Sequence, residues 1–245
     1  MISKLLQPIY SAWVILTFLA SLLAAFPVMF VIGLWDKVWA RKTIWYIVHY
    51  WSIGWLFCLG MPMRRFGKHP GSNKYVYVAN HISYLDTVLI YAAIPYYFRT
   101  LAKKEMARIP VFGYVYKQIA ILVDRSSTES RAKSMRLMWR VLKRECNIAV
   151  FPEGTFNETE KPLKEFYDGA FRLAINTQTA ILPMLFPDTV HRWHYNTILG
   201  LQPGKNRVVY LDPVPTDGMT MDDLPALKEA VHRQMEAALV LSDAG

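Results

Sequence analysis

The stretch K-Y-V-Y-V-A-N-H-I-S-Y-L-D, residues 74–86, decides the predicted fold of this chain. Alternating aromatic and β-branched residues in its first half predict a buried strand, and a helical pattern follows a short turn. The end of the strand therefore carries Asn80 and His81, and Asp86 lies in the first turn of the helix. A strand that leads directly into a helix is typical of an α/β fold.

The histidine and the aspartate of this stretch are too far apart in sequence to be neighbours on one regular helix. The turn lets His81 fold back, so that Asp86 accepts a hydrogen bond from one ring nitrogen and leaves the other free as a base. No G-x-S-x-G nucleophile motif occurs in the chain, so the nucleophile we expect is a substrate hydroxyl. The alternative is a surface histidine beside an unrelated aspartate that the helix dipole stabilises.

The composition is apolar and basic, with 53% hydrophobic residues and a formal net charge of +9 over 245 residues. This length suits one α/β domain with an appendage. A basic chain binds nucleic acid or an anionic membrane surface, and the crowding of apolar residues near the N-terminus favours membrane lipids over nucleic acid. Two cysteines and no cluster with metal-ligand spacing predict a reducing compartment and no metal site.

Two long uncharged runs open the chain. The first, Ile9 to Trp35, is longer than the ~20 apolar residues that cross a bilayer. The second, Thr43 to Met63, is rich in tryptophan and tyrosine, which favour the membrane–water boundary. We therefore expect a membrane-embedded two-helix hairpin over residues 1–65. Basic residues at both ends and in the connector leave two topologies open, and we favour a hairpin that dips into one leaflet over one that spans twice.

Residues 66–245 are expected to form the α/β domain, after a linker at 60–73 that is rich in proline and glycine. Beyond the linker, short apolar runs alternate with helical patterns. The expected strands are 75–79, 98–102, 119–123, 147–151, 179–185 and 206–211, and the expected helices are 84–94, 128–145, 167–176 and 221–240.

Polar residues follow several of these strands. The motif F-P-E-G-T, residues 151–155, offers an acceptor and a donor at a strand end, where α/β folds bind ligands. Its glycine permits close approach of the backbone, although the same letters are also typical of a plain turn. Lys103 and Arg125 follow two further strands and would suit an anionic substrate, although each alone reads as an ordinary surface charge.

Together these motifs resemble the PlsC-type 1-acyl-sn-glycerol-3-phosphate (lysophosphatidic acid) acyltransferase family. Residues 80–86 match its N-H-x-x-x-x-D block, and residues 113–125, 151–155 and 181–183 resemble its other blocks in the same order. The resemblance implies a mixed sheet flanked by helices, with an N-terminal membrane hairpin. It also implies transfer of a fatty acyl group from acyl-CoA or acyl carrier protein to the free hydroxyl of a lysolipid, without a cofactor or a covalent enzyme intermediate.

The resemblance also implies roles for individual residues. His81 would be the catalytic base and Asp86 its partner. The implied substrate-binding residues are Asn80, Lys103, Arg125, Glu153, Gly154, Thr155 and Pro183. The implied location is the inner cell membrane, with the site on the cytoplasmic face, and the oligomeric state stays open.

One departure from the family keeps the acceptor open. Phe156 stands where the family often has an arginine directly after F-P-E-G-T. The acceptor is therefore either 1-acylglycerol-3-phosphate, which gives phosphatidic acid, or a phosphate-free lysolipid such as a lyso-aminolipid. A lipid or thioester hydrolase and a non-enzymatic membrane scaffold are the remaining alternatives.

Overall fold

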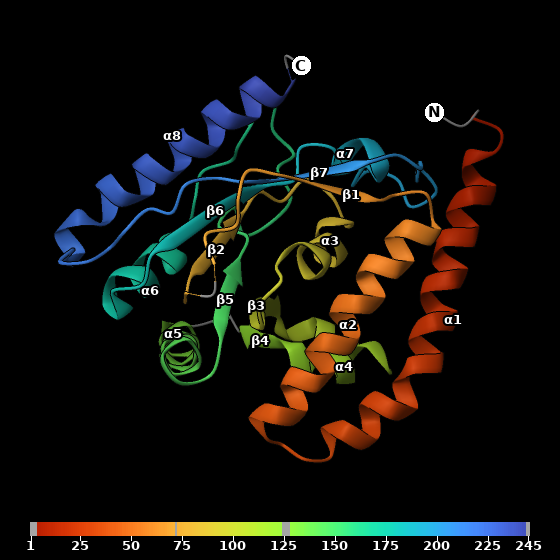
Figure 1. The fold of residues 1–245 in the computed structure, drawn as a ribbon, viewed down its shortest axis with the longest axis horizontal. Helices are drawn as coiled ribbons and strands as arrows, with labels where there is room; N and C mark the ends of the chain where they lie inside the picture. Colours follow the sequence, from red (N-terminus) through yellow and green to blue (C-terminus); the bar gives the residue numbers. More distant parts are fainter. Residues whose placement is uncertain (1–3, 72, 124–127, 244–245) are drawn as a thin grey trace.

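The computed structural model describes residues 4–71, 73–123 and 128–243. Two helices come first, α1 (Gln7–Gly33) and α2 (Val38–Cys58). They pack against each other through Phe18, whose ring lies edge-on to Trp51 and Trp55 with centroids 5.6 and 5.7 Å away. In Figure 1, α1 lies outermost and α2 lies between it and the rest of the molecule.

A seven-stranded sheet in the order β1-β7-β6-β2-β5-β3-β4 forms the centre of the molecule. All neighbouring strands are parallel except β6 and β7, which are antiparallel. The prediction of a mixed sheet is therefore confirmed. The strands are β1 (Met63–Phe66), β2 (Val76–Ala79), β3 (Phe98–Lys103), β4 (Ala120–Val123), β5 (Asn147–Val150), β6 (Ile181–Leu185) and β7 (Asn206–Tyr210).

Helices flank the sheet. Helices α5, α6 and α8 lie together on one side, and α3 and α4 lie with α2 on the other (Figure 1). Their bounds are α3 (Asp86–Ala93), α4 (Phe112–Ile119), α5 (Thr128–Arg144), α6 (Gly169–Thr177), α7 (Thr189–Arg192) and α8 (Leu224–Asp243), with 3₁₀ turns η1 (Lys104–Arg108) and η2 (Met221–Asp223). The four predicted helices and six predicted strands are all present.

The region read as a linker differs from the expectation, because residues 60–73 contain the edge strand β1. Its two arginines and exposed side chains hide the strand from a search for apolar alternation, since β1 borders only β7. The expected domain division between residues 65 and 66 falls inside β1, and that division stays a prediction. The short elements η1, α4 and α7 were also not expected.

Helices α1 and α2 differ in what surrounds them. By length and composition, α1 is the one helix in the described part of the chain that could cross a membrane. In contrast, α2 buries Ile44, Trp45 and Leu56 completely or nearly so, and Trp45 packs edge-on against Phe98 of β3. One side of α2 is therefore part of the protein core. The embedding of both helices in a membrane stays a prediction.

Candidate active site

The site begins where β2 ends. Asn80 follows β2 directly and is fully buried. Its side-chain oxygen accepts a hydrogen bond from the Phe186 backbone N–H at 2.7 Å, and its amide nitrogen donates to the Phe186 carbonyl at 3.3 Å. Because Phe186 follows β6, which pairs with β2, Asn80 fixes the ends of two neighbouring strands to each other. The chain then passes His81 and turns at residues 83–85 before α3 begins.

The turn brings His81 and Asp86 together. The Nδ1 atom of His81 lies 2.9 Å from Oδ2 of Asp86, and the same oxygen accepts the backbone N–H groups of Ile82 at 2.7 Å and Ser83 at 2.8 Å. Asp86 is the first residue of α3 and is completely buried. Three donors from the turn thus converge on one carboxylate oxygen and hold the histidine ring against it.

The second carboxylate oxygen of Asp86 is also occupied. Thr189, at the start of α7, donates its hydroxyl to Oδ1 of Asp86 at 2.5 Å. A carboxylate surrounded by donors acts as an acceptor only, so Nδ1 of His81 carries the proton that they share. The described residues place no hydrogen-bond partner at Nε2 of His81, whose side chain is 14% exposed. This nitrogen is therefore free to accept a proton from a ligand.

Glu153 holds the other side of the His81 turn. Its Oε1 atom accepts the His81 backbone N–H at 2.8 Å, and its Oε2 atom accepts the Lys164 backbone N–H at 3.0 Å. Burial raises the pKa of Glu153 to about 7, against the two backbone hydrogen bonds, and the nearby charge of Asp86 adds to the rise. The carboxyl group therefore links the strand-end turn to the loop that follows F-P-E-G-T.

Aromatic rings enclose the His81 imidazole. Phe151 stacks on it with ring centroids 4.2 Å apart, and Phe156 approaches edge-on at 4.4 Å. The Phe156 ring also contacts Tyr84 at 4.7 Å, and Tyr84 contacts Trp193 at 5.2 Å. These rings form a continuous apolar wall that leads away from the imidazole.

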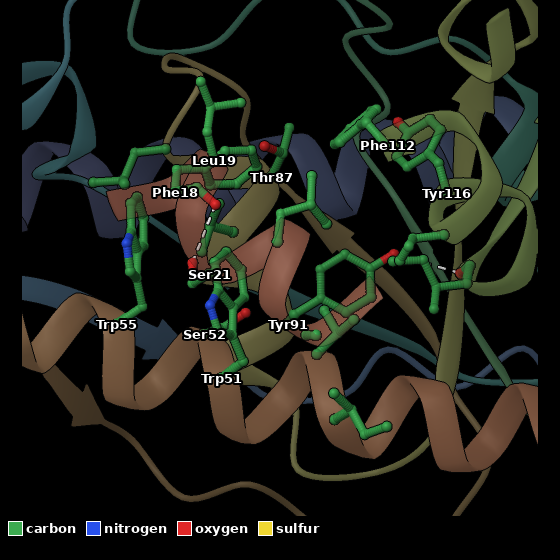
Figure 2. A pocket seen from close by; sticks show the side chains of 18 of the residues that line it. Phe18, Leu19, Ser21, Trp51, Ser52, Trp55, Thr87, Tyr91, Phe112 and Tyr116 are labelled. Atoms are coloured by element: carbon green, nitrogen blue, oxygen red, sulfur yellow. Dashed lines mark hydrogen bonds between the residues drawn. The ribbon is translucent and has the colours of Figure 1, made fainter. Parts of the chain in front are cut away.

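That wall borders an apolar cavity of about 310 Å³ between α1, α2, α3 and α4, in which Tyr84 and Trp193 both take part. Figure 2 shows side chains that line it, among them Phe18 and Leu19 of α1, Trp51 and Trp55 of α2, and Phe112 and Tyr116 of α4. The polar groups of its lining side chains are hydroxyls of serine, threonine and tyrosine and the indole N–H groups of tryptophan. Such a space accepts a hydrocarbon chain rather than a charged group.

The remaining predicted residues lie in different places. Gly154 has a left-handed φ of 73°, and Thr155 accepts a hydrogen bond from the Lys164 ammonium group at 2.9 Å. Lys103 ends β3 and is exposed at the edge of the sheet where β2 and β5 also end. Pro183 is buried inside β6, paired with Val78 rather than at the edge. Arg125 lies outside the described residues.

Two residues that we expected to bind the substrate point into the protein instead. Asn80 and Glu153 were expected to contact the substrate, but both are completely buried and bonded to backbone groups. Sequence alone does not tell which way a polar side chain points at a strand end. Thr189 and Lys164 were not expected at the Asp86 and Glu153 carboxylates, because nothing in their spacing marks them. Among the described residues, no group of three or more His, Cys, Asp and Glu side chains is placed to hold a metal ion.

Two proteins named as acyltransferases are similar in sequence to most of this chain. A 1-acyl-sn-glycerol-3-phosphate acyltransferase of Cocos nucifera is 31% identical over 179 residues, which cover 72% of this chain and 58% of the relative. The human 1-acyl-sn-glycerol-3-phosphate acyltransferase alpha is 31% identical over 185 residues, covering 75% of this chain and 65% of the relative. The chain thus spans about three fifths of the length of these relatives.

A solved structure supports the fold independently. The crystal structure of PlsC, a 1-acyl-sn-glycerophosphate acyltransferase from Thermotoga maritima, superposes with a TM-score of 0.74 at 21% identity and covers 99% of this chain and 97% of its own. The family model described as Acyltransferase matches residues 64–186, just over half of the chain, and this segment includes the His81 turn and F-P-E-G-T. The chain therefore belongs to the acyltransferase family.

Proposed function

We propose that the chain is an O-acyltransferase that moves a fatty acyl group from acyl-CoA or acyl carrier protein to the free hydroxyl of 1-acylglycerol-3-phosphate, giving phosphatidic acid. One observation carries the proposal. The His81–Asp86 pair leaves Nε2 without a partner among the described residues, beside aromatic rings that lead into an apolar cavity. The relatives from Cocos nucifera and human are named for acyl transfer to this substrate, which supports the proposal.

In the proposed reaction, Nε2 of His81 accepts the proton of the acceptor hydroxyl as its oxygen attacks the thioester carbonyl. The tetrahedral intermediate then collapses, the carbon–sulfur bond breaks, and the imidazolium returns the proton to the leaving thiolate. Asp86 stabilises the transient imidazolium and keeps the ring oriented through Nδ1. Ester product and free thiol leave, and no bond to the protein forms.

Binding of the hydrocarbon chain is assigned to the cavity between α1 and α4. Its walls are almost entirely apolar, and each methylene group that leaves water contributes about 0.8 kcal/mol. We propose that an acyl chain enters past Tyr84 and Trp193, which places its carboxyl end near His81. Both helices of the N-terminal pair supply walls, so this pair is part of the site rather than only an attachment.

Two acceptor headgroups are candidates. Phe156 packs on His81 in the place where an arginine is common, which favours a phosphate-free lysolipid such as a lyso-aminolipid as the second candidate. We propose instead that Lys164, whose ammonium group contacts Thr155, supplies the cation for a phosphate. Gly154 and Thr155 would line this position, and Lys103 and Arg125 stay candidates for the same role.

Membrane attachment is proposed through the outer surface of α1. The exposed apolar side chains of this helix include Ile9, Trp13, Leu16, Leu23, Val28 and Val31. Because α2 buries one side against the protein core, we propose that the pair lies in one leaflet rather than spanning the bilayer twice. We also propose that this membrane is the inner cell membrane and that the active site faces the cytoplasm.

The test incubates the full chain with labelled acyl-CoA or acyl-carrier-protein thioester and a panel of lysolipids with and without phosphate. We expect labelled phosphatidic acid from 1-acylglycerol-3-phosphate. Product only from phosphate-free acceptors would replace the proposed substrate by the second candidate. Free fatty acid without any acceptor would instead identify a thioester hydrolase, and no turnover of any lipid would leave the scaffold alternative.

A further inference from the structure

A second cavity, of about 540 Å³, lies at the edge of the sheet opposite His81. It is lined by the α1–α2 connector, the start of α2, the start of β3, the end of α4 and the last turns of α5. Arg99 is the second residue of β3, whereas the His81 turn follows the end of the parallel strand β2. Five lining side chains are cations and two are carboxylates: Arg41, Arg99, Lys117, Arg140, Arg144, Asp36 and Glu145.

Both carboxylates are already engaged with a single cation. Arg41 donates from Nε and Nη2 to the two oxygens of Glu145, each at 3.1 Å, and from Nη1 to Asp36 at 2.7 Å. Burial alone would raise the pKa of Glu145, but hydrogen bonds from Arg41 and from Tyr97 hold it below its ordinary value. Glu145 is therefore ionised. It is hydrogen-bonded to Arg41, and its charge also acts on Arg99, to which it makes no hydrogen bond among the described residues.

The four remaining cations make no ion pair or hydrogen bond to a carboxylate among the described residues. Arg99 donates from Nη2 to the Ala120 carbonyl at 2.7 Å, yet its Nε is buried without any hydrogen-bond partner in the described part of the chain. Like charges around one cavity repel each other, and a buried guanidinium N–H without an acceptor is destabilising. An anion with several oxygens in the cavity would reduce the repulsion between the cations and accept a hydrogen bond from Nε of Arg99.

The surroundings of the cavity indicate where such an anion comes from. The connector beside it and the first residues of α2 expose four apolar side chains, Leu34, Trp35, Val38 and Trp39, and the two indole rings lie 5.9 Å apart. Exposed tryptophans favour the level of the lipid headgroups, and these residues continue the exposed apolar surface of α1. At that level, the abundant anions are phosphates of membrane lipids, whose geometry matches guanidinium groups.

We propose that this basic cavity binds the phosphate headgroup of an anionic membrane lipid, apart from the catalytic site. The bound lipid would bridge the α1–α2 connector to α5 and hold the N-terminal pair on the sheet. The inference uses the membrane attachment proposed above but not the acyl-transfer reaction, so that a chain without transferase activity would leave it standing.

The test measures binding of the full chain to phosphatidylcholine vesicles with and without phosphatidylglycerol. The variant Arg140→Gln/Arg144→Gln removes two cavity cations from exposed positions on α5. The control Lys133→Gln/Arg136→Gln removes the same charge from the same helix, at positions that do not line the cavity. We expect the cavity pair to weaken binding to the anionic vesicles about thirtyfold, and the control pair to weaken it much less.

Each outcome decides the proposal. Equal loss in both variants would show a diffuse basic surface and overturn it, and so would no loss in the cavity variant. A second experiment adds inorganic phosphate to the wild-type chain bound to anionic vesicles. If phosphate releases the chain at concentrations equal to the lipid phosphate, the cavity binds a soluble phosphate and the lipid assignment is wrong. Thermal unfolding of both variants checks that the fold is intact.

Discussion

Replacing Glu153 with Gln tests how the buried carboxyl holds the His81 turn. Each of its two oxygens accepts one backbone N–H, from His81 and from Lys164. A glutamine has the same shape but presents an NH₂ group in place of one oxygen, so one of the two backbone donors faces another donor. An unmet buried donor costs about 1–3 kcal/mol, and the position of the His81 backbone is no longer fixed from that side.

The same substitution removes a titrating group, so its effect on the free energy of unfolding depends on pH. Because burial raises the pKa of Glu153 from 4.5 to about 7, the folded chain binds more protons than the unfolded chain between these values. Stability from this group is therefore present at acidic pH and is lost as the pH rises towards 7. A shift of this size corresponds to about 3 kcal/mol, and the amide that replaces the carboxyl group does not titrate.

We therefore expect the unfolding free energy of the variant, relative to wild type, to rise by about 3 kcal/mol between about pH 4 and pH 8. For a chain of this size, this is about 6–12 °C in the difference between the two melting temperatures. Thermal unfolding followed by circular dichroism in an uncharged detergent measures this difference. The control is Glu165→Gln, at an exposed neighbouring position. Parallel pH curves for wild type and Glu153→Gln would refute the reasoning, as would an equal effect in the control.

Three further substitutions probe other parts of the site. Asp86→Asn should lower single-turnover acyl transfer by orders of magnitude while circular dichroism stays unchanged, since an amide does not hold the same imidazole tautomer. Lys164→Gln should raise KM for 1-acylglycerol-3-phosphate about tenfold or more, as expected for one lost charge-assisted contact, and leave KM for a phosphate-free lysolipid unchanged; equal effects on both would remove Lys164 from the headgroup site. Val88→Phe fills part of the apolar cavity, so competition between thioesters should shift towards shorter chains, and an unchanged preference would place the acyl chain elsewhere.

Apolar periodicity predicted most of the fold because the central strands are buried on both faces. All four residues of β2 and of β5 are buried, so their apolar runs are plain in the sequence. The edge strand β1 carries Arg64 and Arg65 and pairs only with β7, so its polar composition resembles a linker. The packing of α2 against the core was likewise hidden, because one helix faces both α1 and β3.

Motif order predicted which residues meet at the site but not how each one acts. His81 and Asp86 lie in one turn, so their contact follows from local geometry. The hydroxyl on the far side of Asp86 comes from Thr189, 103 residues later, and only the folded chain brings it there. Glu153 has the polarity of a substrate ligand, yet its direction is set by two backbone donors that no sequence pattern reveals.

The most direct test of the central claim is acyl transfer by His81→Ala. The variant and the wild-type chain are given a labelled acyl thioester and 1-acylglycerol-3-phosphate, and vesicle attachment is measured on the same preparations. We expect labelled phosphatidic acid to fall to background while attachment stays at the wild-type level, because His81 belongs to the turn after β2 and not to the exposed apolar side chains of α1. Turnover close to wild type in this variant would contradict the assignment of His81 as the base.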